Sequence, residues 1–104
     1  RIAPLKNDIV INKTGYSAFH ETGLHQLLQS KGIGTLVVTG LTTSQCVNSS
    51  ARAASDYGYV TLMVEDAQAD YDRSDHQAAL LASEPITGQG ISTSQVLEMI
   101  SQRA

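Results

Sequence analysis

The sequence predicts an α/β fold in which a parallel sheet is sandwiched between helices. Two segments, Thr35–Gly40 (TLVVTG) and Tyr59–Glu65 (YVTLMVE), are nearly continuous runs of β-branched and aliphatic residues. Such runs are typical of parallel strands that are covered on both faces. Helical patterns alternate with these strands, and this alternation favours a parallel sheet with right-handed crossovers. Residues 1–104 fit one domain at the small end of the usual size range.

Two further segments complete the predicted sheet. Asp8–Lys13 (DIVINK) has a clear strand pattern, and a weaker one lies near Thr87–Ile91. Ligands of open α/β sheets gather beyond the carboxyl ends of the strands. Lys13 ends the first predicted strand and Cys46 follows the second, so we expect these two side chains on the same edge of the sheet.

Four helices are predicted from apolar periodicity and from capping residues. The first is capped by Thr22, has an apolar stripe of Leu24, Leu27 and Leu28 and stops at Gly32, and the second, Ser44–Tyr57, has a stripe of Val47, Ala51 and Ala54. The third, Asp75–Ser83, is opened by a Ser74/Gln77 capping box and has a buried side of His76, Ala79 and Leu80. The last is opened by a Ser92/Gln95 capping box, and its Val96, Leu97 and Ile100 are expected to face inward.

Composition excludes several classes of function. The net charge is −3, and the seven Lys and Arg are scattered rather than clustered, which argues against a nucleic-acid partner. No apolar tract is long enough to cross a bilayer, and no signal-peptide pattern opens the chain. A single cysteine excludes an internal disulfide and favours a reducing, cytoplasmic compartment.

Cys46 lies where a buried strand turns sharply into a helix. With Thr42 or Thr43 as the N-cap, Cys46 occupies about the third or fourth helical position. Free N–H groups and the positive end of the helix dipole there favour a thiolate, which is the form that a cysteine nucleophile needs. Two simpler interpretations remain open on pattern alone: an inert buried cysteine, and a solvated charge at Lys13.

Several motifs, taken in order, resemble the isochorismatase-like cysteine hydrolases, a family that includes nicotinamidases and N-carbamoylsarcosine amidases. The resemblance runs from about Asp8 to Leu97. It rests on D-I-V-I-N-K (8–13), Y-S-A-F (16–19), T-G-L (22–24), L-V-V-T-G (36–40), T-S-Q-C-V (43–47), A-R-A-A-S-D-Y-G-Y (51–59), V-E-D-A (64–67) and His76 with A-A-L (78–80).

The resemblance implies a Rossmann-like three-layer α/β/α sandwich and specific roles for several residues. Cys46 would be the nucleophile and Lys13 the catalytic lysine. The Leu41–Thr42 peptide bond would be cis, and the Thr42 and Cys46 N–H groups would form an oxyanion hole. Tyr16 and Phe19, which follow Lys13, could line the substrate pocket or simply pack the connection to the next helix.

The family also uses an aspartate on a strand upstream of all these motifs, and this sequence contains no such strand. Asp8 lies at the opposite end of its strand from Lys13, and the family pattern treats Asp66 as structural. We therefore expect residues 1–104 to be the C-terminal part of one hydrolase domain whose N-terminal strand or strands are missing here. The start at Arg1, without a methionine, suggests a processed, cut or internally selected segment. Alone it should be inactive.

The resulting functional prediction is hydrolysis of a small amide through a thioester on Cys46, with an Asp-Lys-Cys triad whose Asp lies outside this chain. We expect as partners a small-molecule amide, the missing N-terminal segment or a sister chain, and a homo-oligomer, dimer or tetramer. No cofactor or metal is predicted, because His20, His25 and His76 lack metal-ligand spacing. The alternative is a non-catalytic or redox-sensing member that acts as a structural or interaction subunit.

Overall fold

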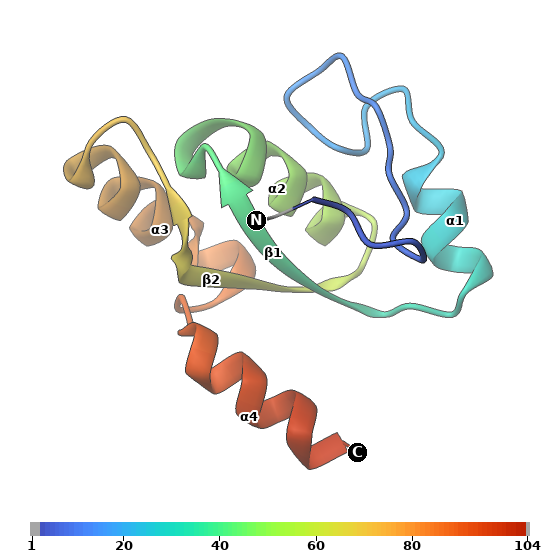
Figure 1. Ribbon diagram of the computed structural model, residues 1–104. Coiled ribbons are helices and arrows are strands. Elements are labelled where there is room, and N and C mark those ends of the chain that lie inside the picture. Colours follow the sequence, from blue (N-terminus) through green and yellow to red (C-terminus); the bar gives the residue numbers. More distant parts are fainter. Residues whose placement is uncertain (1–2, 104) are drawn as a thin grey trace.

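The computed structural model describes residues 3–103 and has the α/β architecture that the sequence predicts (Figure 1). Strands and helices alternate from Thr35 onward, which confirms the fold class. The elements, in chain order, are α1 (Leu24–Ser30), β1 (Thr35–Leu41), the π-helical turn η1 (Thr43–Val47), α2 (Asn48–Asp56), β2 (Val60–Ala69), α3 (Arg73–Thr87) and α4 (Thr93–Arg103).

β1 and β2 form a parallel pair with an interruption in the middle of β2. The register runs from Thr35↔Val60 to Val38↔Met63 and resumes at Gly40↔Gln68. Between these two pairs, one residue of β1, Thr39, therefore faces four of β2, residues 64–67, so these residues of β2 bulge out of the pair. The side-chain Nε2 of Gln68 donates to the Val38 carbonyl at 3.0 Å and bridges the interruption. The bulge thus returns the end of β2 to the end of β1.

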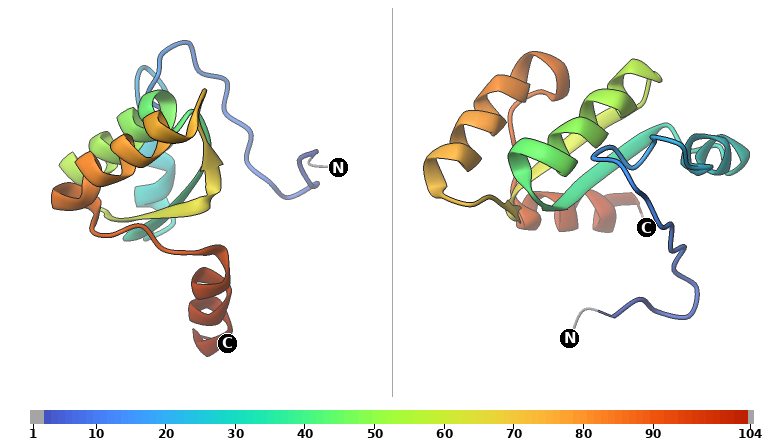
Figure 2. Two further views of the ribbon diagram at one scale, coloured as in Figure 1. Left: turned by 90° about the vertical axis from the view of Figure 1, so that its left-hand side faces the viewer. Right: turned by 90° about the horizontal axis from the view of Figure 1, so that it is seen from above.

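One face of the sheet is covered by α2 and α3, which lie side by side (Figure 2). The core cluster consists of Val47, Ala51 and Met63, with Val38 and Leu80 packed against it. Each large apolar side chain buried in this way stabilises the fold by about 1.5–3 kcal/mol. The apolar stripe predicted for α2 is confirmed, because its members are at most 4% exposed.

Two predicted strands are wrong in this structure. Residues 8–13 form no strand, because a strand needs a hydrogen-bonding partner and the described residues supply none for this segment. Near Thr87–Ile91, α3 continues through Thr87, and only Ile91 forms a bridge, which pairs it in parallel with Val64.

The N-cap residues of α3 and α1 differ from those that the sequence predicts. Asp72, not Ser74, caps α3: its carboxylate accepts the Asp75 N–H at 2.8 Å, and the Ser74 hydroxyl donates to the same group. Gly23 holds the N-cap position of α1, while the hydroxyl of Thr22 accepts the Leu24 N–H at 3.4 Å.

The last helix, α4, projects away from the rest of the molecule (Figure 1). Its capping box is confirmed, since the Ser92 N–H donates to Gln95 and the Gln95 N–H donates to Ser92. Its stripe, however, does not face inward in this structure. Leu97 and Ile100 are each 60% exposed, because the described residues put no packing surface against them. Within residues 3–103, none of the helices has the length and apolar character that a bilayer crossing requires.

Candidate active site

Cys46 is the fourth residue of η1, the turn that follows β1. At this point the chain turns sharply: Gly40 has a φ of 117°, and the Leu41–Thr42 peptide bond is cis. The Thr42 carbonyl then accepts the N–H groups of Gln45 at 3.0 Å and of Val47 at 3.2 Å, which closes the turn. The Cys46 side chain is half-buried, so its sulfur is reachable from one side.

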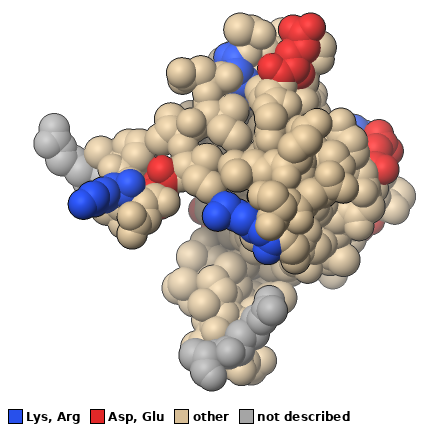
Figure 3. Space-filling view, turned by 90° about the vertical axis from the view of Figure 1, so that its right-hand side faces the viewer, with Lys and Arg blue, Asp and Glu red and all other residues tan. Residues whose placement is uncertain are grey.

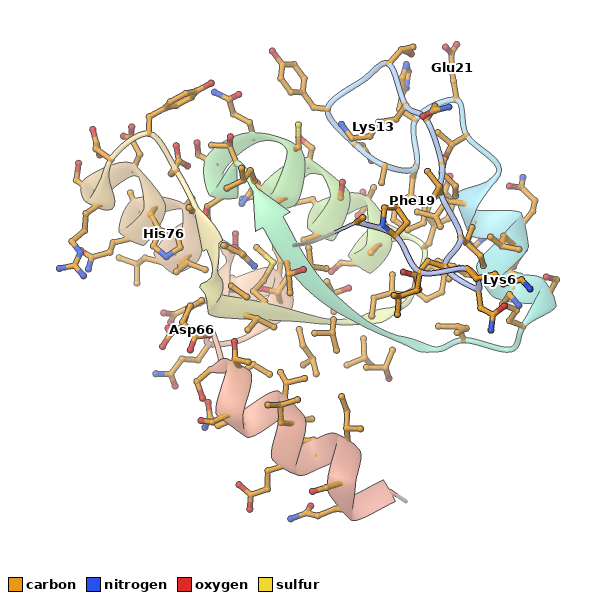
Figure 4. All side chains as sticks on the ribbon, viewed as in Figure 1. Lys6, Lys13, Phe19, Glu21, Asp66 and His76 are labelled. Atoms are coloured by element: carbon orange, nitrogen blue, oxygen red, sulfur yellow. The ribbon has the colours of Figure 1, made fainter. Side chains whose placement is uncertain are left out.

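Lys13 lies beside Cys46 although its segment is not a strand. The ammonium Nζ donates to the carbonyls of Gly15 at 2.8 Å and Tyr16 at 3.3 Å, and lies 3.5 Å from the Cys46 sulfur. An ammonium has three protons to donate, and these three contacts account for all of them. The loop that carries Lys13 (Figure 4) therefore folds around the cation, and the third contact of the ammonium is the Cys46 sulfur.

Contacts with α2 and its C-terminal end hold this loop in place. The Ala18 N–H donates to the Ser50 hydroxyl on α2 at 2.8 Å. The Phe19 ring lies 5.3 Å from the ring of Tyr57 and 6.1 Å from that of Tyr59, distances at which aromatic pairs attract. The position of Lys13 thus depends on a side-chain anchor rather than on sheet hydrogen bonds.

A cavity of about 370 Å³ opens next to Cys46 and Lys13. Apart from Lys13, Cys46, Thr39 and Ser50, its lining is apolar and comes from the 18–28 segment, β1, η1 and α2. Phe19 lines the cavity, as one of the two predictions for it proposed. Tyr16 does not belong to the lining, and its side chain is 65% exposed. What Tyr16 supplies is its backbone carbonyl, which holds Lys13.

The N–H groups predicted to receive an oxyanion belong to this same turn. Within residues 3–103, no hydrogen bond occupies the Thr42 N–H. The described residues also place no carboxylate in hydrogen-bond contact with Cys46, whose recorded side-chain partner is Lys13. A proton acceptor for the thiol therefore has to come from elsewhere or be water.

Two residues that the sequence did not single out as a pair, one just before α3 and one within it, contact η1. The Asp70 carboxylate accepts the Ser44 N–H at 2.7 Å, and the hydroxyl of Thr43 lies 2.7 Å from Nδ1 of His76. The hydrogen bond with Ser44 is the main cause that lowers the pKa of Asp70 below its ordinary value of 3.8, and the N–H of Tyr71 and the nearby His76 act in the same direction. The feature of the sequence that could have indicated these contacts is the acidic segment before α3, followed by His76 within that helix.

The remaining titratable candidates lie apart from the cavity. His25 contacts the Tyr59 hydroxyl at 2.7 Å, and His20 lies 3.9 Å from Glu21, so the three histidines occupy three separate places. The part of the chain that the structure describes holds no cluster of three or more metal-ligating side chains. Asp66 accepts both the N–H and the hydroxyl of Thr93, which ties it to the start of α4.

Charge is sparse on the surface. On the face that Figure 3 shows, the Lys and Arg side chains are few and separated from one another. That distribution is unlike the stripe of cations that neutralises a phosphate backbone.

The sequence resembles a known family of proteins. Residues 1–95 match the family model of the isochorismatase domain. The chain is 29% identical over 103 residues to maleamate amidohydrolase of Pseudomonas putida, covering 99% of this chain and 48% of that protein. It is 41% identical over 66 residues to ureidoacrylate amidohydrolase RutB of Agrobacterium fabrum, covering 64% of this chain and 29% of that protein.

A solved structure shows the same fold. The isochorismatase-like hydrolase from Alkaliphilus metalliredigens superimposes with a TM-score of 0.91 at 26% identity, over 94% of this chain and 54% of that one. The chain thus spans about half the length of the first curated relative and of this structure.

Proposed function

Because the chain belongs to the isochorismatase domain family, we propose that it forms the C-terminal part of a hydrolase that cleaves a small amide with Cys46 as nucleophile. The similarity to maleamate amidohydrolase and ureidoacrylate amidohydrolase supports the amide as the substrate class. The observation that carries the proposal is the 3.5 Å contact between Lys13 Nζ and Cys46 Sγ beside a cavity of about 370 Å³. An ammonium at this distance donates to the sulfur and holds it beside the cavity, where a substrate carbonyl can be attacked.

The reaction runs in two halves. The thiolate attacks the amide carbonyl carbon, and the N–H groups of Thr42 and Cys46 receive the negative charge that develops on the oxygen. The C–N bond breaks, the amine leaves with the proton taken from the thiol, and a thioester remains on Cys46. Water then adds to the thioester, the C–S bond breaks, and the carboxylic acid and the thiol are released.

Lys13 and an aspartate divide the proton and charge chemistry. Lys13 stabilises the thiolate and the oxyanion through its positive charge and is itself held by two carbonyls. An aspartate outside these 104 residues takes the thiol proton and passes it to the leaving amine, as a general base and then a general acid. The chain alone would accordingly be inactive.

A second candidate is a non-catalytic or redox-sensing subunit. It is favoured by one observation: within the described part of the chain, Cys46 touches a cation but no proton acceptor of the carboxylate kind. A half-exposed thiolate next to a cation is also the setting of a peroxide-sensitive cysteine. This candidate predicts reversible oxidation of Cys46 at low peroxide without turnover of any amide.

Substitutions in the full-length protein separate the two candidates. Cys46→Ala and Lys13→Ala should each abolish turnover of maleamate, ureidoacrylate or a related amide while leaving the melting temperature unchanged. Lys6→Ala is the matched control for Lys13→Ala, because Lys6 lies in the same N-terminal segment, exposed and away from the cavity lining. Full turnover by Cys46→Ala would refute the proposed nucleophile.

A further inference from the structure

The π-helical turn η1, which carries Cys46, has no side-chain cap of its own. No side chain within η1, nor that of its N-cap residue Thr42, bonds the free N–H groups at the start of the turn. Such groups are normally satisfied by a side chain at the N-cap position. Here an acceptor from another element, the Asp70 carboxylate, takes the Ser44 N–H at 2.7 Å.

The sheet register explains why Asp70 is available at this point. After the bulge in β2, Leu41 pairs with Ala69, so the residue after Ala69 lies opposite the start of the turn. The same carboxylate is fixed by the N–H of Tyr71 at 2.7 Å. Its lowered pKa agrees with a carboxylate that is held ionised by these donors.

A second contact reaches the turn from α3. Thr43 is fully buried, and its hydroxyl meets Nδ1 of His76 at 2.7 Å. A buried hydroxyl is held in one orientation by such a partner, because leaving it unpaired costs free energy. Neither Thr43 nor His76 lines the cavity that contains Cys46, so neither is placed to touch a substrate.

We propose that His76 and Asp70 are positioning residues: together they clamp Thr43 and Ser44, and so hold the sulfur of Cys46 next to Lys13. The two clamped residues lie three and two positions before Cys46 in one turn of helix. Movement of the turn would therefore change the contact between sulfur and ammonium directly. The inference rests on the proposed function for its catalytic meaning, but the clamp itself can be tested without a substrate.

The test is a double-mutant cycle on the rate of Cys46 alkylation by iodoacetamide in the full-length protein. Thr43→Val keeps the shape of the side chain and removes the hydroxyl, and His76→Leu removes the partner. Each should slow alkylation about fivefold, the magnitude expected for one hydrogen bond, because the sulfur is held less of the time in its position beside Lys13. The double variant should be no slower than the slower single variant.

Controls separate a clamp from a general loss of packing. Thr43→Ser keeps the hydroxyl and should restore the parent rate, even if His76→Leu proves too unstable to measure. Thr87→Val makes the same change at a hydroxyl that bonds within α3, at the Ser83 carbonyl, and should have no effect. Asp70→Ala should slow alkylation as Thr43→Val does, since it removes the acceptor of the Ser44 N–H.

The outcomes keep this inference distinct from the proposed function. Parent-like alkylation in Thr43→Val and Asp70→Ala would overturn the clamp, whatever the amide turnover. Slowed alkylation that Thr43→Ser restores would support it, even if Cys46→Ala still turned over amides and the proposed function failed. Where turnover does require Cys46, the same variants should lower kcat and leave KM within about twofold, because they touch no part of the cavity.

Discussion

At the scale of single residues, the site consists of the Lys13 ammonium, which donates all three of its protons, and the Cys46 sulfur, which the turn η1 positions. Lys13 and Cys46 were predicted as neighbours because Lys13 ends one strand-like segment and Cys46 follows another. The structure places Lys13 Nζ 3.5 Å from Cys46 Sγ, although residues 8–13 form no strand. The contacts of Asp70 and His76 could not be predicted, because they connect residues 26 and 33 positions apart in the sequence. They depend on the bulge in β2, which no local sequence pattern indicates.

Asp66 shows how a carboxylate of this chain acts as a structural group. Hydrogen bonds from the hydroxyl and the N–H of Thr93 lower its pKa below the ordinary value of 3.8. A lowered pKa means that the folded state favours the ionised form, so the stabilisation is present above pH 3.8 and is lost as the pH falls below that value. Figure 4 shows Asp66 close to the start of α4.

We therefore predict that α4 frays in acid. Amide hydrogen exchange at the start of α4 should become faster as the pH falls through and below 3.8, after correction for the intrinsic rate. Asp66→Asn should show fast exchange already at neutral pH and little further change in acid. Glu98→Gln, an exposed change within α4, is the control. Equal protection in Asp66→Asn and the parent at neutral pH would contradict the assigned role.

At the scale of elements, the type and order of β1, α2, β2 and α3 were predicted because their signals are local. Their bounds were not: residues 43–47 form the turn η1 ahead of α2, β2 continues to Ala69 and α3 to Thr87. Apolar runs fix the strands, and small residues such as Ala51 and Ala54 mark the helix face that packs on them. Elements that depend on absent or distant neighbours were not predictable. Residues 8–13 have a strand pattern without a partner among residues 3–103, and two of the three apolar stripe residues of α4, Leu97 and Ile100, are largely exposed.

Gly40 is the element-scale position most sensitive to change. Its φ of 117° lies in a region that residues with a side chain rarely adopt, and it directly precedes the turn that carries Cys46. Gly40→Ala should lower the free energy of unfolding by about 1–3 kcal/mol, as measured by urea titration. Gly34→Ala is the matched control, since a Cβ there meets nothing within 4 Å and the backbone needs no positive φ. Equal effects of the two substitutions would exclude a special constraint at Gly40.

At the scale of the whole molecule, the described residues leave one edge of the sheet open. β1 pairs with β2 on one side only, and the apolar part of the cavity lining follows β1. Leu41 is 71% exposed and Val37 is 47% exposed, although both belong to an apolar strand. The unpaired N–H and C=O groups of an open edge strand can hydrogen-bond to another strand. We therefore expect this edge to be covered by further residues of the protein, upstream of this chain, or by a second copy of it.

Hydrogen exchange tests this expectation. In the 104-residue chain alone, the β1 amides that face away from β2 should exchange quickly. In a longer protein that contains the chain, these same amides should be protected by at least about tenfold, because they acquire hydrogen-bond partners. The amides of α2, which are bonded within the helix, provide an internal reference. Fast exchange along this edge in the longer protein would show that the edge stays open.

The central claim is that Cys46 carries the acyl group during turnover, and acid-quench mass spectrometry of the full-length protein tests it directly. The protein is mixed with an amide substrate, quenched in acid within the first turnover and digested. The account predicts that the peptide containing Cys46 gains the mass of the acyl group, and that Lys13→Ala lacks this gain. Turnover accompanied by an adduct on another residue, with Cys46 unmodified throughout, would contradict it.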